Sequence, residues 1–155
     1  MTLTKYRKKR DFKTSPEPPG DTKRRTHKPL LYVVQKHRAS QLHYDFRLEF
    51  NGVLLSWAVP KGPSLDPSVK RLAMQVEDHP VEYANFEGVI PEGEYGGGTV
   101  MVWDTGSWLP EQEEVAAALT KGDLKFTLRG KNSEVPGCWC APAGSDGVPE
   151  NHGCS

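Results

Sequence analysis

The chain has 155 residues, with 20 Lys or Arg against 20 Asp or Glu, and 36% of its residues are hydrophobic. No run of about eighteen apolar residues is present, so a transmembrane helix and a membrane partner are excluded. The polar, basic N-terminus does not resemble a secretory signal, and we expect a cytoplasmic protein. The length suits one domain whose hydrophobic core forms without disulfides.

Charge divides the chain into unequal parts. Residues 1–28 hold ten Lys or Arg and three Asp or Glu, whereas residues 29–155 hold ten and seventeen. This N-terminal arm has few core-forming side chains and several prolines, which predicts disorder for the arm alone. Its cationic clusters suit attraction to phosphate backbones, although a solvated tail explains the charge equally well. We therefore predict an arm (1–28), a folded body (29–130) and a divergent C-terminal segment (131–155).

The body begins at Leu30, where short β-rich segments separated by Gly, Pro and Asn predict an all-β, mainly antiparallel fold. A strand is expected over residues 30–36 and a hairpin over residues 42–59, with Asn51-Gly52 as its type I′ turn. This turn fixes the register of the hairpin, so that four apolar residues of each strand share one face. They are Tyr44, Phe46, Leu48 and Phe50 opposite Val59, Trp57, Leu55 and Val53.

Residues 71–79 alternate in the same way, with Leu72, Met74 and Val76 on the predicted apolar side. The glycine-rich residues 93–99 lack the Gly-Lys-Ser/Thr ending of a P-loop, so they indicate a turn or bulge.

Two further strands are predicted over residues 99–103 and 124–128, and one short helix over residues 110–119 between them. Pro110 near the start, acidic residues in the first turn and Gly122 after the end are typical of such a helix. The pattern as a whole predicts a small β-barrel with one short helix and a basic, partly disordered N-terminal arm.

Two histidines and a carboxylate form the first group with candidate chemistry. His43 and Asp45 are two residues apart on one predicted strand, so both project from one face at about 7 Å separation. His37, six residues earlier, can complete the set from a preceding strand end. Two imidazoles and a carboxylate form an open ligand set for Mn²⁺, Fe²⁺ or Zn²⁺. The H-x-D pair alone is a weak signal, which polar residues on a solvated strand also explain.

Arg47 follows on the same strand face, and its planar guanidinium suits a phosphate through paired charge-assisted hydrogen bonds. His79 could serve as a general acid, a phosphate donor or a transition-state stabiliser, and Tyr83 lies close to it in sequence. Three more polar residues are expected at the same groove: Lys61, Arg71 and Glu77. Taken singly, such residues usually belong to an ordinary surface, so the hypothesis depends on their coincidence.

Several motifs are similar to those of one known family. They are Arg10-Asp11-Phe12 with Pro16-Glu17-Pro18, Gln35-Lys36-His37, Leu42-His43-Tyr44-Asp45-Phe46-Arg47-Leu48-Glu49, Trp57-Ala58-Val59-Pro60-Lys61-Gly62-Pro63, and Glu77-Asp78-His79-Pro80. With these motifs the chain resembles the 3′-phosphoesterase domain attached to bacterial ligase D of non-homologous end joining, which also occurs as stand-alone proteins. The resemblance covers most of residues 10–130. The basic, apolar last strand usual in the family is not evident after residue 130, where only Gly137 and Trp139 match.

The resemblance implies a small β-barrel enzyme that uses Mn²⁺ to process the 3′ end of a DNA or RNA/DNA primer-template. A phosphodiesterase step removes a terminal ribonucleoside, and a phosphomonoesterase step then releases the 3′-phosphate to leave a 3′-hydroxyl. A DNA ligase or another end-joining protein is the implied partner. Matching positions give His37, His43 and Asp45 to the metal, and Arg47 and His79 to the scissile phosphate. The remaining matches are Tyr83, Lys61, Arg71 and Glu77 in the site, and Arg10, Asp11 and Glu17 in the arm.

Other interpretations of the same residues stay open. A non-haem Fe²⁺ oxygenase uses an H-x-D pair with a distant histidine. A nucleic-acid-binding barrel would hold backbone phosphates on its polar face without catalysis. Cys138 and Cys140 with His152 and Cys154 could bind zinc, but their one-residue gaps depart from the usual spacing, and we expect reduced thiols.

Overall fold

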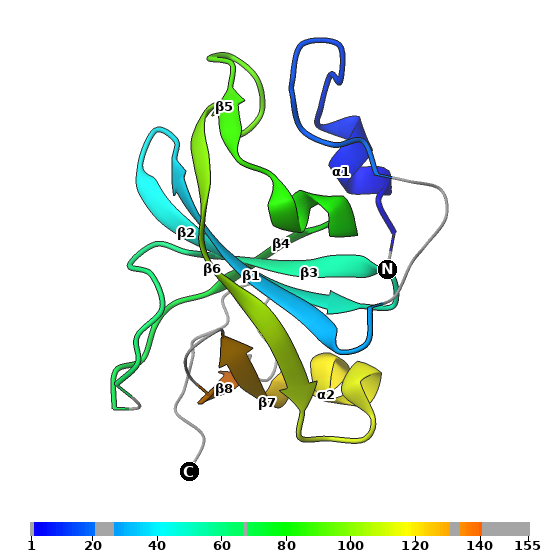
Figure 1. The fold of residues 1–155 in the computed structure, drawn as a ribbon, viewed down its shortest axis with the longest axis vertical. Helices are drawn as coiled ribbons and strands as arrows, with labels where there is room; N and C mark the ends of the chain where they lie inside the picture. The colour runs from blue at the N-terminus through cyan, green and yellow to red at the C-terminus, as the bar shows by residue number, and fades with distance from the viewer. Residues whose placement is uncertain (1, 21–26, 67, 131–133, 141–155) are drawn as a thin grey trace.

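The computed structural model describes residues 2–20, 27–66, 68–130 and 134–140. Within them an eight-stranded antiparallel sheet curls into a half-barrel (Figure 1). The elements in chain order are α1 (Thr4–Lys8), β1 (Leu30–Arg38), β2 (Leu42–Phe50), β3 (Val53–Val59), β4 (Met74–His79), the 3₁₀ helix η1 (Val81–Asn85), β5 (Gly88–Ile90), β6 (Gly98–Pro110), α2 (Val115–Lys121), β7 (Asp123–Gly130) and β8 (Glu134–Cys140). The predicted all-β, mainly antiparallel fold class is therefore confirmed.

Strand order in the sheet is β4-β3-β2-β1-β6-β7-β8, with β5 paired to β6. The predicted hairpin is confirmed in its register, since Phe50 pairs with Val53 and Tyr44 with Val59. Asn51 and Gly52 have φ angles of 49° and 75°, the left-handed values that a type I′ turn requires. The turn chemistry thus sets which side chains of β2 and β3 reach each face of the sheet.

Each face of the sheet is covered by a different set of elements. The predicted apolar face of the hairpin lies in the larger core, together with Trp108 of β6, Val115 of α2 and Leu124 of β7. The other face carries a smaller cluster, which η1 and the N-terminal arm cover. The members of that smaller cluster are Tyr6, Val33, Leu54, Tyr83 and Ala84. Figure 1 shows α1 beside η1 on one side of the sheet, and α2 with β7 on the other.

Two expectations about helices are corrected. Strand β6 continues to Pro110, which pairs with Phe126 of β7, so helix α2 begins only at Val115. A proline fits the end of a strand as well as the first turn of a helix, because both positions need no amide donor. Gly122 ends α2 with φ 73°, as predicted. The second correction is that the arm contributes its own helix, α1.

The predicted facing of residues 71–79 is wrong. Leu72 and Met74, placed on the apolar side, are 39% and 38% exposed, while Ala73 joins the larger core. Strand β4 also contains an irregularity, because Val76 pairs with Ser56 whereas His79 pairs with Leu54. Three steps along β4 therefore match two along β3, which turns His79 toward the face that carries Arg47.

The structure also extends the sheet past residue 130. Strand β8 over Glu134–Cys140 pairs antiparallel with β7, in a segment where we expected the family pattern to be lost. The proposed zinc set includes His152 and Cys154, which lie outside the described residues. Among the described residues, no helix is long and apolar enough to cross a membrane.

Candidate metal and phosphate site

Three candidate metal ligands converge on one face of the β1–β2 pair. The register sets His37 opposite His43 and Gln35 opposite Asp45, so consecutive odd-numbered residues of both strands share this face. Nδ1 of His37 lies 3.3 Å from one Asp45 carboxylate oxygen, and Nε2 of His43 lies 3.3 Å from the other. One ligand atom from each residue lies within 4.8 Å of the other two. This spacing allows all three side chains to reach a single cation.

Backbone carbonyls orient both imidazoles for this purpose. Nε2 of His37 lies 2.7 Å from the carbonyl oxygen of Gly96, and Nδ1 of His43 lies 3.2 Å from that of Gln41. Because a carbonyl can only accept, these nitrogens carry hydrogens. The opposite ring nitrogens, which face Asp45, are therefore the ones that would lose a proton to bind a cation. Outer hydrogen bonds of this kind fix the tautomer of metal-binding histidines.

The charges around Asp45 favour its ionised form. Burial by itself raises the pKa of the Asp45 carboxyl, but Arg47 and the hydrogen bonds from His37 and His43 hold that pKa well below its ordinary value. The hydrogen bond to Asp45 in turn raises the pKa of His43. Asp45 thus draws positive charge to this point, and a divalent cation would replace the proton on His43.

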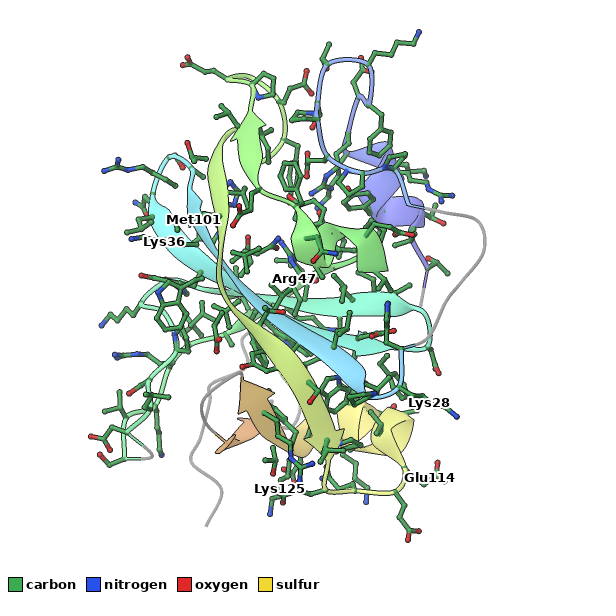
Figure 2. The ribbon with its side chains drawn as sticks, in the orientation of Figure 1. Lys28, Lys36, Arg47, Met101, Glu114 and Lys125 are labelled. Carbon is green, nitrogen blue, oxygen red and sulfur yellow. The ribbon has the colours of Figure 1, made fainter. Side chains whose placement is uncertain are left out.

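Arg47 lies at the centre of the molecule, between the sheet and η1 (Figure 2). Its side chain is 3% exposed, with Nη2 placed 3.3 Å from Asp45. Nε donates to Gln35 Oε1 at 2.8 Å, and the guanidinium lies 4.8 Å from the centre of the Tyr83 ring. The third nitrogen, Nη1, is buried and has no hydrogen-bond partner in the described structure. An orphaned cationic donor costs free energy, so this atom is a candidate to receive an anionic ligand.

Gln35 belongs to the site, although its place in the Gln35-Lys36-His37 motif did not predict a role for it. It is fully buried, and its Nε2 donates to the carbonyls of Tyr83 at 2.8 Å and Phe86 at 3.1 Å. Its Oε1 is the acceptor for Arg47. The side chain therefore ties the guanidinium to η1. Gln35 and His37 are two residues apart on β1, so alternation along the strand could have predicted that both face the site.

The N-terminal arm contributes two of its predicted residues to this site. Arg10 forms ion pairs with Glu17 at 2.8 Å and with Glu77 at 3.1 Å, and all three side chains are at most 5% exposed. Glu17 also accepts a hydrogen bond from the Tyr83 hydroxyl at 2.9 Å. Burial raises the pKa of Tyr83, which therefore stays a neutral donor. The arm is thus linked to both η1 and β4 through buried charges.

His79 is held in one tautomer. Its Nδ1 lies 2.8 Å from the carbonyl oxygen of Glu77, which can only accept, and its Nε2 lies 3.3 Å from Nη2 of Arg10, which can only donate. The hydrogen therefore resides on Nδ1 and the lone pair on Nε2. Burial, with Arg47 and Arg10 nearby, holds the pKa of His79 well below its ordinary value. The imidazole is neutral near pH 7, which makes Nε2 an acceptor rather than an acid.

These side chains line a cavity of about 310 Å³. Of the predicted residues, Arg10, Glu17, His37, His43, Asp45, Arg47, Glu77, His79 and Tyr83 line it. Tyr95 and Gly96 close another part of the wall, and Lys9 bridges Glu77 and the Tyr95 hydroxyl at 3.1 Å each. These three residues were not predicted, because their contribution depends on how a loop and the arm meet.

Three predicted residues lie outside this lining, and their roles stay predictions. Lys61 is exposed in the turn after β3. Arg71 donates through Nε to the carbonyl of Gly62 at 3.1 Å. The Asp11 carboxylate accepts from the backbone amide of Lys13 at 2.9 Å and is exposed.

The three metal-ligand candidates, the carbonyls that orient their imidazoles and the guanidinium nitrogen without a described partner together fit a divalent cation beside a phosphate group. Such a site in an antiparallel half-barrel suits a phosphoesterase. Residues 35–140 match the family model described as the DNA ligase D 3′-phosphoesterase domain, and the chain belongs to this family.

Three relatives illustrate the similarity. The multifunctional non-homologous end joining protein LigD of Pseudomonas aeruginosa is 57% identical over 138 residues, which is 88% of this chain and 16% of that protein. The multifunctional non-homologous end joining DNA repair protein LigD of Mycobacterium tuberculosis is 52% identical over 71% of this chain and 14% of its own length. LigD of Mycolicibacterium smegmatis is 43% identical over 83% of this chain and 18% of its own length. The chain thus spans less than a fifth of the length of these relatives.

Proposed function

We propose that this chain is a Mn²⁺-dependent phosphoesterase that processes the 3′ ends of DNA or RNA/DNA primer-templates during DNA end joining. It has two activities, a 3′-ribonuclease (phosphodiesterase) step and a 3′-phosphatase (phosphomonoesterase) step. The observation that carries the proposal is the buried Nη1 of Arg47, which has no partner among the described residues and lies beside His37, His43 and Asp45. A phosphate oxygen there would satisfy the guanidinium next to the three residues that would hold a cation.

The side chains of the cavity divide the work around a bound phosphate. His37, His43 and Asp45 would hold a divalent cation, which would supply Lewis-acid polarisation of the phosphate when bound. Arg47 donates through Nη1 to a non-bridging oxygen, where negative charge grows in the transition state. Gln35 and Asp45 hold its guanidinium plane, so little reorganisation is needed during the reaction.

His79 supplies a proton acceptor. Its neutral Nε2 can take a proton from an attacking water or a neighbouring 2′-hydroxyl once Arg10 turns toward the phosphate. The resulting imidazolium then donates to the leaving oxygen. Tyr83 remains a phenol through this cycle and keeps Glu17 and Arg10 in position.

The product of the second step is a 3′-hydroxyl, which is the group that a DNA ligase joins. A DNA ligase or another end-joining protein is therefore the partner class that we propose. The relatives are named as non-homologous end joining proteins, and the chain matches only a small part of each of them.

The test compares hydrolysis of a primer-template that ends in a 3′-phosphate, with and without Mn²⁺. We expect His43→Ala to abolish both the phosphatase and the ribonuclease step, because it removes a metal ligand that both steps share. Arg47→Ala should lower kcat/KM by at least a hundredfold while leaving the affinity for Mn²⁺ nearly unchanged. His27→Ala is the matched control, since that imidazole is half exposed and lies outside the cavity lining.

Near-normal turnover by His43→Ala would contradict the proposed metal site. Oxygen consumption with Fe²⁺ and an oxo-acid would support an oxygenase instead. If the protein binds the primer-template equally well with a chelator present and leaves its 3′ end unchanged, the result would support a non-catalytic nucleic-acid-binding barrel.

A further inference from the structure

The sheet face opposite the cavity carries exposed apolar and cationic side chains that the proposed reaction does not use. We call this group the outer patch. Its exposed members are Arg38, Leu42, Met101 and Trp103, and the half-buried Lys36 and Tyr44 lie beside them. Leu42, Met101 and Trp103 are 47%, 48% and 52% exposed. Large apolar side chains gathered at one exposed place mark an interaction surface more often than scattered ones do.

The strand register makes the outer patch continuous. Lys36 on β1 pairs with Tyr44 on β2 and with Met101 on β6, and Arg38 pairs with Leu42 in the next row. Directly paired residues of antiparallel strands share a face and lie about 5 Å apart. Figure 2 shows Lys36 and Met101 side by side at one edge of the ribbon.

Trp103 is brought into the patch by an irregularity in β6. Val34 pairs with Asp104 and Gln35 with Val102, so Trp103 is the extra residue at this bulge. Its ring meets the Tyr44 ring edge to face, with 5.6 Å between centroids. Trp103 is therefore fixed in orientation while half of its surface stays open.

The patch has unneutralised positive charge. Neither Lys36 nor Arg38 forms an ion pair or side-chain hydrogen bond within the described residues. One carboxylate shares these rows, that of Asp104, and it already accepts from the Tyr32 hydroxyl at 2.8 Å and the Thr105 amide at 3.0 Å. Lys36 and Arg38, without an ion pair among the described residues, lie beside the exposed indole of Trp103 and the thioether of Met101. This combination suits a single-stranded nucleic acid, in which phosphates alternate with bases.

The outer patch and the cavity lie back to back on the same two strands. His37 faces the cavity, while Lys36 and Arg38 on either side of it face the patch. The turn between β1 and β2 joins the two faces, because Ala39 in that turn also lines the cavity. A strand that leaves the cavity can therefore reach the patch by passing over this turn.

We propose that the outer patch binds the unpaired strand of a primer-template whose 3′ end occupies the cavity. One base stacks on Trp103, and Lys36 and Arg38 contact the flanking phosphates. This inference rests on the proposed function, since it takes the substrate to be a nucleic-acid end. A protein partner would also cover Leu42 and Met101, but Lys36 and Arg38, which have no counter-ion among the described residues, favour a polyanion.

The test measures dissociation constants for primer-templates with unpaired strands of zero, two, four and eight nucleotides. The wild-type protein should bind more tightly once the unpaired strand is long enough to pass over the β1–β2 turn and reach the patch. Trp103→Ala should lose this gain, with about tenfold weaker binding of the long substrates and unchanged binding of the blunt one. Trp103→Phe keeps a stacking ring and should retain most of the gain.

Lys36→Ala should lower the slope of log Kd against log salt concentration by about one for the long substrates. Lys28→Ala is its matched control, because Lys28 precedes β1 at the far end from Lys36 (Figure 2).

Hydrolysis of a small phosphomonoester with Mn²⁺ separates the two proposals. Trp103→Ala should hydrolyse it at the wild-type rate, because Trp103 lies across the sheet from the cavity. If the wild-type protein hydrolyses neither the small ester nor a 3′-phosphate end, the proposed function fails. If the wild-type protein is active but Trp103→Ala binds every length equally well, or weakens blunt and long substrates alike, the inference about the outer patch is overturned. Retention of a purified end-joining protein by the wild type but not by Trp103→Ala, with no effect on DNA, would also overturn it.

Discussion

The buried hydrogen bond between Gln35 and Arg47 orients the Arg47 guanidinium. Of its three nitrogens, Nε donates to Gln35, Nη2 lies beside Asp45, and Nη1 has no partner among the described residues. The Gln35 side chain is held in place because its own amide donates to the carbonyls of Tyr83 and Phe86. The result is a preorganised donor, which is the feature that electrostatic catalysis needs.

Gln35→Ala should therefore lower kcat by about tenfold to a hundredfold, since a hydrogen bond to a charged group contributes roughly 1.5–3 kcal/mol. The affinity for Mn²⁺ should change little, because the hydrogen bonds of the Gln35 side chain go to Arg47, Tyr83 and Phe86 and not to the metal ligands. Steady-state kinetics with a 3′-phosphate substrate and a metal titration measure both quantities. Gln41→Ala is a matched control, as the Gln41 side chain is exposed. Equal kcat values for Gln35→Ala and wild type would contradict a positioning role.

His79 should make the free energy of unfolding depend on pH. Its folded-state pKa lies below the ordinary value, so the folded protein binds fewer protons than the unfolded chain as pH falls below about 6.5. This contribution to stability is present above pH 6.5 and is lost as pH falls from there toward the folded-state pKa. Arg10 and Arg47 face the ring and oppose its protonation, whereas Asp45 and the Glu77 carbonyl favour it.

Urea unfolding of the metal-free protein between pH 5 and 7.5 measures this effect. The contribution of His79, taken as the difference between the wild type and His79→Gln, should fall with decreasing pH by up to about 1.4 kcal/mol per pH unit. His79→Gln keeps one donor and one acceptor, so it removes the titration and not the hydrogen-bonding capacity. If His79→Gln shows the same pH dependence as the wild type, His79 is not the group responsible.

At the scale of elements, the N-terminal arm is part of the site wall. Tyr6 of α1 is fully buried, donates to the carbonyl of Pro18 at 2.7 Å, and packs 4.9 Å from the His79 ring and 4.0 Å from the Arg10 guanidinium. One aromatic side chain thus secures a segment that has little other apolar surface. Tyr6 therefore acts together with the ion pairs of Arg10 to hold Arg10 and Glu17 at the cavity.

Tyr6→Ala should release the arm. We expect faster proteolysis at its lysines and arginines and a loss of at least tenfold in turnover, with Mn²⁺ affinity preserved because the metal ligands lie on β1 and β2. Limited proteolysis followed by mass spectrometry, together with kinetics on the same samples, checks both effects. Lys5→Ala, an exposed change on the same helix, should alter neither. Full turnover in a variant whose arm is readily cleaved would contradict the role given to the arm.

The elements also differ in how far the sequence could predict them. The β2–β3 hairpin follows from Asn51-Gly52 alone, because a local turn fixes the register of every pair beside it. The facing of β4 depends on a bulge that only the packing against β3 creates. Composition predicts disorder for the arm because it counts apolar residues and not their partners, and Tyr6 finds its partners on β4 and η1. The convergence of His37 with His43 and Asp45 was predictable from alternation, whereas the Gly96 carbonyl that orients His37 comes from a distant loop.

At the scale of the whole molecule, one sheet separates two functions. The larger core between the sheet, α2 and β7 supplies stability, and the smaller cluster on the opposite face supports the cavity. Leu124 and Leu54 allow the two faces of the sheet to be compared, because both are fully buried leucines, one in each cluster. Leu54 pairs with His79 of β4 and packs in the cluster that contains Tyr6 and Tyr83.

Truncation of either leucine to alanine should cost about 2–5 kcal/mol of unfolding free energy, because each leaves a cavity in a packed cluster. The catalytic consequences should differ. Leu124→Ala should keep the wild-type kcat when assayed well below its melting temperature, since Leu124 lies on the face away from the site. Leu54→Ala should lower kcat severalfold, because the ring of His79 and the wall around Tyr83 lose the side chain that supports them. Urea unfolding and kinetics on the same two variants test this, and equal effects on kcat would show that the sheet does not insulate one face from the other.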